Sequence, residues 1–137
     1  MGIKQTFKRV FSTNTETSEK HYDEHLRTHY YKSTKDKVLK EVETMFNQRN
    51  GFTVSSVSQE HGEVIVRIEK GKKALIVGTV IMVKPFRTAV DFSVSTDTFL
   101  FTDFGYSRKI AQSLYKDLNS RLTFVGTGLG EKLTDSF

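Results

Sequence analysis

Three histidines are the first residues whose type and spacing could do chemistry. His21, His25 and His29 recur every four residues, so on one continuous helix they would share a face. Imidazoles on a shared face can bind zinc. The competing prediction is an irregular segment that enters a strand at 27–32, which would turn His29 away. The sequence has no HExxH motif and no fourth anchored ligand. We therefore assign no metal ligand and no cofactor, and the histidine series stays open here.

Other chemical patterns in the chain favour structural roles. Gly126, Gly128 and Gly130 follow a predicted helix and lack the Gly-Lys-Ser/Thr ending of a phosphate loop. The lysines of 70–73 are typical of a solvated hairpin tip, and we expect the aromatic residues of 99–106 in the core rather than on a stacking surface. No residues are arranged to orient a nucleophile, so we predict that the protein is not an enzyme.

Residues 1–20 are predicted to form a basic amphipathic arm followed by a polar linker. The net charge is +5, and residues 1–40 hold nine Lys and Arg against five Asp and Glu. Apolar residues of 3–11 recur at helical spacing with cations between them, which suits an anionic membrane surface. The candidate contacts in the arm are Lys4, Phe7, Lys8, Arg9 and Phe11.

Hydrophobic periodicity predicts one α+β domain over 21–125. A helix is expected from Ser33, with a capping-box-like start, to about Arg49. The expected strands are 27–32, 52–57, 64–69, 73–83 and 90–95, and a second helix opens at 103–107. This β-α-β(4)-α order predicts a twisted antiparallel sheet with both helices packed on one face. Residues 126–137 are expected as a Gly-rich flexible tail.

The strand at 73–83 is apolar on both of its faces. Two alternating sets of residues make up these faces: Leu75, Val77, Ile81 and Val83 on one, and Ala74, Ile76, Val80 and Met82 on the other. Because the helices can cover only one face, the second needs the arm, another copy of the chain or a ligand. We predict that Ile76, Val80 and Met82 lie on the open face as an interface.

The element order resembles the TATA-binding-protein-like and helix-grip folds. Residues 102–109, with the sequence TDFGYSRK, resemble the segment that precedes the last helix in the DUF1499 family of uncharacterised bacterial proteins. This resemblance implies a bacterial, non-catalytic protein. Arg108 and Lys109 fall in the first helical turn, where the helix dipole disfavours cations. We therefore expect an anionic partner for them, either Asp103 or an external anion.

These observations predict a non-enzymatic binding or interaction module that forms a homodimer or docks a partner through the open sheet face. One alternative is a peripheral membrane or lipid-binding module that uses the basic arm, or a site for a hydrophobic ligand. The other alternative, nucleic-acid binding, is less favoured because the strand block is close to neutral. The chain has no Cys and no apolar run of about 20 residues, so we expect a cytoplasmic or membrane-peripheral protein.

Overall fold

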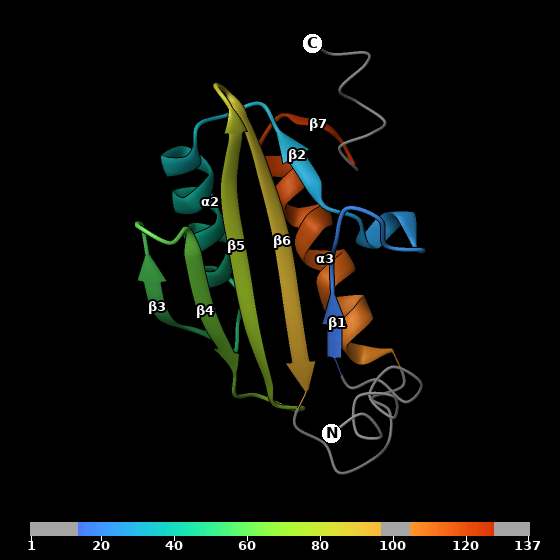
Figure 1. Ribbon diagram of the computed structural model, residues 1–137. Coiled ribbons are helices and arrows are strands. Elements are labelled where there is room, and N and C mark those ends of the chain that lie inside the picture. Colours follow the sequence, from blue (N-terminus) through green and yellow to red (C-terminus); the bar gives the residue numbers. More distant parts are fainter. Residues whose placement is uncertain (1–13, 97–104, 128–137) are drawn as a thin grey trace, which may run out of the picture.

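The computed structural model describes residues 14–96 and 105–127 as one antiparallel sheet with two helices packed on the same face (Figure 1). The elements in chain order are β1 (Asn14–Glu16), η1 (Glu24–Leu26), β2 (His29–Tyr31), α2 (Lys35–Asn47), β3 (Phe52–Ser58), β4 (Glu63–Ile68), β5 (Ala74–Lys84), β6 (Arg87–Thr96), α3 (Tyr106–Arg121) and β7 (Phe124–Thr127). The predicted α+β class and the predicted position of both helices are confirmed.

The sheet is ordered β3-β4-β5-β6-β2-β7, and β1 also pairs with β6. Two short strands therefore share one edge of β6, one after the other. β2 pairs with residues 88–90 of β6, and β1 pairs with residues 93–95. The long β5–β6 hairpin is the central unit of the sheet (Figure 1).

Helix α2 forms where its apolar stripe predicts. Val38, Leu39, Val42, Met45 and Phe46 are all buried against the sheet. The N-cap is Thr34, whose hydroxyl accepts a hydrogen bond from the Lys37 amide, and not Ser33 as predicted. The shift has a physical reason, because the Ser33 carbonyl already accepts a 2.7 Å hydrogen bond from the Thr88 hydroxyl. This bond holds the β2–α2 connection against the hairpin.

Two predicted segment boundaries are wrong. The expected linker up to residue 20 contains β1, and the expected flexible tail begins inside β7. In both cases an open strand edge supplies backbone partners that local sequence does not reveal: β6 takes up β1, and β2 takes up β7. The arm at 1–13 and the rest of the tail, at 128–137, lie outside the described residues.

The predicted face of β5 is also wrong. Ile76 and Val80 are 0% and 1% exposed, because they point toward the helices. Cross-strand partners share a face, and Ile76 lies between Val66 of β4 and Val94 of β6. These neighbouring strands are apolar on that face beside Ile76 and Val80 and mixed, with Glu63, Arg67, Asp91 and Ser93, on the other, so they decide the orientation of β5. The open face therefore carries the other set of β5 residues, and of the predicted interface only Met82 is exposed.

This orientation predicts opposite outcomes for lysine at two adjacent positions. Val80→Lys buries an ammonium group without a partner and should lower the free energy of unfolding by about 3 kcal/mol or more. Ile81→Lys places the same group in solvent and should change it by less than about 1 kcal/mol. Urea unfolding of both variants measures the difference, and equal losses would contradict the assigned faces.

Candidate functional site

The described residues present two features that could bind another molecule. One is the tip of the β5–β6 hairpin, residues 81–87, which we call the hairpin tip. The other is a cavity beside α3, under the β2–β7 edge of the sheet. They are built from different elements and have different chemistry, so each is described separately.

The hairpin tip is apolar and exposed. Its exposed hydrophobic side chains are Ile81, Met82, Val83 and Phe86. The tip projects past the end of β4, whose last pairing partner along β5 is Thr79, so β4 cannot cover these residues. Half of the large exposed hydrophobic residues of the described chain therefore gather within one short hairpin. A concentrated apolar patch of this kind marks an interaction surface more often than scattered exposed residues do.

Phe86 sits at the turn of this hairpin in a strained conformation. Lys84 pairs with Arg87, so Pro85 and Phe86 are the two central residues of the turn. Phe86 has a φ of 58° and is the only non-glycine residue with positive φ in the described part of the chain. Glycine is usual at such a position after proline, and a larger residue costs about 1–2 kcal/mol there. Because Phe86 is 62% exposed, little burial offsets this cost.

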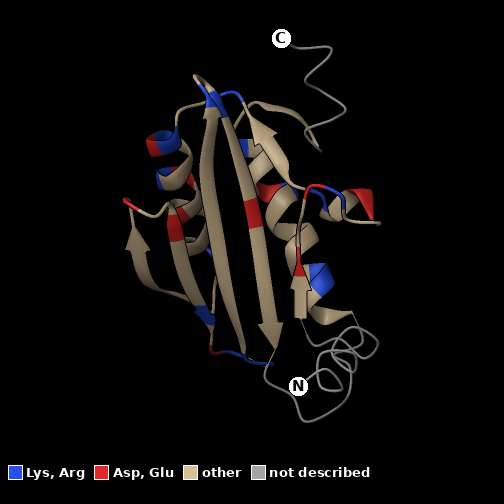
Figure 2. Cartoon of the chain, in the orientation of Figure 1, with Lys and Arg blue, Asp and Glu red and all other residues tan. Residues whose placement is uncertain are grey.

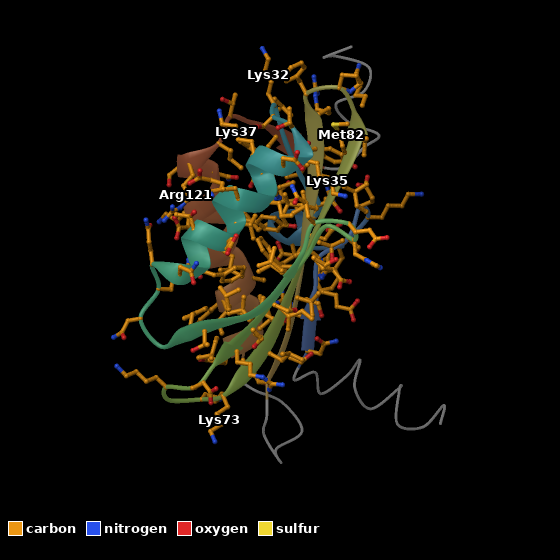
Figure 3. All side chains as sticks on the ribbon, turned by 90° about the vertical axis from the view of Figure 1, so that its left-hand side faces the viewer. Lys32, Lys35, Lys37, Lys73, Met82 and Arg121 are labelled. Carbon is orange, nitrogen blue, oxygen red and sulfur yellow. The ribbon has the colours of Figure 1, made fainter. Side chains whose placement is uncertain are left out.

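Lys and Arg residues lie at the hairpin tip and in the neighbouring segment that leads from β2 into α2 (Figure 2). The tip and residues 32–37, which form the β2–α2 connection and the first turn of α2, together hold five Lys and Arg and a single carboxylate. Figure 3 shows Lys32 and Lys37 at the same end of the molecule as Met82, while Lys73 lies at the opposite end. The N-terminus of α2 lies in this region and adds the partial positive charge of the helix dipole. The tip is therefore apolar, with Lys and Arg residues beside it.

The cavity has a volume of about 840 Å³ and lies between η1, α3 and the β2–β7 edge. Helix α3 contributes one stripe of residues with helical spacing, Gln112, Tyr115, Lys116 and Asn119. Glu24 and His25 of η1 lie on another side, and residues 124–127 of β7 form a third. His29 of β2 completes the lining.

His29 is fixed inside this lining by its two neighbours. Its ring stacks on Tyr115 with centroids 3.6 Å apart and an interplanar angle of 5°, and Phe124 lies 4.8 Å away. Nδ1 donates a 2.8 Å hydrogen bond to the Arg27 carbonyl, because a carbonyl oxygen can only accept. Burial lowers the pKa of His29 to about 4, so the ring is neutral at physiological pH.

The three histidines do not form a metal site. His25 lies in η1 and is largely exposed, whereas His29 is buried in β2. His21 stacks on Tyr22. Over the described ranges, no group of three or more His, Cys, Asp or Glu side chains is placed to hold a metal ion. The strand at His29 breaks the continuous helix on which that hypothesis depended.

Arg108 has an internal partner that the sequence did not identify. Its guanidinium forms a 2.9 Å ion pair with Asp23 and a hydrogen bond to the Tyr22 hydroxyl. Asp23 is also the N-cap of η1, and the hydrogen bond from the His25 amide helps to keep its pKa low. Lys109 points to solvent on α3. Asp103, like the predicted contacts of the N-terminal arm, lies outside the described residues.

Sequence reasoning missed the hairpin tip and the cavity for different reasons. The tip had a local signal, because an aromatic residue after Lys84-Pro85 is unusual in a tight turn. The cavity had none, since its lining comes from four elements that are far apart in the sequence.

Comparison with known proteins adds no relative from which a function could be carried over. No protein-family model, curated protein or solved structure matches the chain. The resemblance to the DUF1499 family therefore stays a prediction. Within the described residues, no helix is long and apolar enough to cross a membrane.

The buried neutral His29 predicts a specific loss of stability in acid. Its folded-state pKa of about 4 lies below the ordinary histidine value of 6.5, so the unfolded chain binds its proton first as the pH falls. The contribution of His29 to the free energy of unfolding is complete above pH 6.5. It decreases by about 3 kcal/mol as the pH falls toward 4. Urea unfolding between these pH values should show a weaker pH dependence for His29→Phe than for the wild type. Identical slopes would contradict a neutral buried imidazole.

Proposed function

We propose that the protein is a non-enzymatic peripheral binding module that docks on an anionic lipid surface through the hairpin tip. The observation that carries this proposal is Phe86, an exposed aromatic residue at a strained turn position. Strained residues persist where a function retains them. From the element order we also propose a TATA-binding-protein-like or helix-grip-like topology. Fold alone assigns no function.

The combination of side chains favours a membrane interface over a nucleic acid. Aliphatic and aromatic side chains at the tip can enter the boundary between headgroups and acyl chains, while cations beside them meet anionic headgroups. A surface that binds nucleic acid would need only the cations, and the exposed Ile81, Met82 and Val83 would have no part in that binding. The tip lies at one end of the sheet, past the end of β4 (Figure 1).

The expected affinity is weak and reversible. Each cation close to an anionic surface contributes about 1 kcal/mol. Transfer of a side chain such as Phe86 or Met82 out of water contributes roughly 1.5–3 kcal/mol when it is complete. A few such residues support a dynamic encounter, and no permanent anchor is needed.

The described chain begins at Asn14, far from the hairpin tip along β6. Asn14 pairs with Ser95, near the end of β6 that is remote from Arg87. Eight residues of strand separate these positions, or roughly 26 Å at ~3.3 Å per residue. Deletion of residues 1–11 therefore tests the arm independently of the hairpin tip.

Self-association over the open sheet face is the second candidate function. Leu75 and Ile81 are exposed on this face. Ile65 and Val77 pair with each other across β4 and β5 and are partly exposed on the same face. Light scattering gives the molar mass and so shows whether the protein is a dimer. If Leu75→Ser dissociates this dimer without loss of vesicle binding, the two functions belong to separate surfaces.

The vesicle-binding prediction compares matched charge reversals at the two ends of the molecule. Lys84→Glu should weaken flotation with phosphatidylcholine–phosphatidylglycerol vesicles by about tenfold or more, because it reverses a charge beside the apolar tip. Lys73→Glu changes the net charge equally at the opposite end (Figure 3) and should have little effect. Phe86→Asn should also weaken binding by about tenfold, whereas Tyr22→Asn removes another exposed aromatic residue and should not.

Three outcomes would overturn this assignment. Equal effects of Lys84→Glu and Lys73→Glu would show that only net charge matters. Loss of binding on deletion of residues 1–11, with no effect of the tip variants, would assign the membrane contact to the arm. Binding to duplex DNA that falls steeply with salt and depends on Lys84, without vesicle binding, would assign the tip to nucleic acid.

Glycine at position 86 should separate stability from binding. Phe86→Gly removes the strain of a side chain at positive φ and should raise the free energy of unfolding by about 0.5–1 kcal/mol. The same variant should lose vesicle binding, because the aromatic ring is absent. Urea unfolding and flotation of one preparation test both effects. A less stable variant would mean that Phe86 is retained for packing.

A further inference from the structure

The cavity beside α3 has a built aromatic inner wall that the proposed function of the hairpin tip does not use. His29 lies against the Tyr115 ring and close to the Phe124 ring, and Tyr31 lies 5.8 Å from Phe124. The Tyr115 hydroxyl is directed away to Thr17 and the Val90 carbonyl, and its ring is buried beneath His29. Phe124 is 39% exposed, so its ring is the part of the wall that is open to a ligand. A planar ring of a ligand could pack against Phe124 beside His29.

His29 adds one hydrogen-bond acceptor to this wall. Because Nδ1 carries the proton that is donated to Arg27, Nε2 is left with a lone pair. Nε2 has no hydrogen-bond partner within the described residues, and it is not fully buried. It is therefore in contact with solvent, in the cavity that His29 lines. A ligand N–H or O–H group could donate to Nε2.

The rim of the cavity supplies charge of both signs. Lys116 is exposed on α3, and neither Lys116 nor Gln112 has a side-chain hydrogen bond or ion pair within the described part of the chain. Lys116 can thus bind an anionic group. Glu24 lines another side of the cavity and disfavours a ligand with several negative charges. One anionic group on the ligand fits this distribution.

We propose that this cavity binds a planar aromatic monoanion that also carries an N–H or O–H donor. The ring packs on the aromatic wall, the donor meets Nε2 of His29, and the anionic group meets Lys116. The volume of about 840 Å³ falls within the range of small-molecule sites, about 300–1,000 Å³. The site is separate from the hairpin tip, so either proposal can fail without the other.

The test uses the full chain and the fluorescent probe 8-anilinonaphthalene-1-sulfonate, which has a planar ring system, one N–H donor and one sulfonate. Fluorescence titration should show one saturable site. Lys116→Gln should weaken it by about tenfold, the typical effect of one lost charge-assisted hydrogen bond. Lys109→Gln removes an exposed cation from the same helix outside the cavity lining and should leave the affinity unchanged.

His29→Phe keeps a ring in the wall and removes the acceptor, so it should also weaken probe binding. Phe86→Asn serves as the control for probe bound at the hairpin tip. Should His29→Phe fail to fold, the nitrogen resonances of His29 in the wild-type protein still report on the contact, because Nε2 should shift strongly on probe addition and Nδ1 little. Titration without saturation, equal affinity of Lys116→Gln and wild type, or an unmoved Nε2 resonance would overturn the proposal.

Discussion

The half-buried carboxylate of Asp91 is the constraint on which much of this structure depends. It lies on β6 between the segment that pairs with β2 and the segment that pairs with β1. Thr17 and Thr28 each donate a 2.7 Å hydrogen bond to its Oδ1. Burial raises the pKa of Asp91 despite these two donors. Because a partly buried carboxylate without partners is costly, these hydrogen bonds favour the observed positions of the two threonines. They hold the chain where one edge strand ends and the other begins.

The same contacts reach through the sheet to α3. Thr17 accepts hydrogen bonds from the Phe92 amide, at 2.9 Å, and from the Tyr115 hydroxyl, at 2.8 Å. Tyr115 is thereby fixed at its polar end, and its ring provides the surface on which His29 stacks. The inner wall of the cavity is therefore set by polar contacts on the far side of its rings. This arrangement explains how an open cavity can keep a defined aromatic wall.

The cavity wall and the hairpin tip show opposite ways to present apolar surface. At the wall, burial and hydrogen bonds fix the rings, so little rearrangement is needed on binding. At the tip, Phe86 is exposed and strained, so the native fold retains it at a cost. The opposite basic turn, residues 70–73, makes the contrast clear. It carries three lysines, but no large hydrophobic residue of that turn is exposed, as expected of a solvated turn.

Local periodicity in the sequence was enough to predict the α+β class, the range of α2, the start of α3 and the approximate ranges of β3 to β6. These features depend on neighbours within a few residues along the chain. Tertiary structure alone decided which face of β5 is open, because a strand with two apolar faces takes its orientation from β4 and β6. Only tertiary structure paired Arg108 with Asp23, added β1 and β7 to open edges, and gathered the cavity lining from four elements. Each of these outcomes depends on which segments meet across long sequence separations, and no pattern within a single segment encodes that.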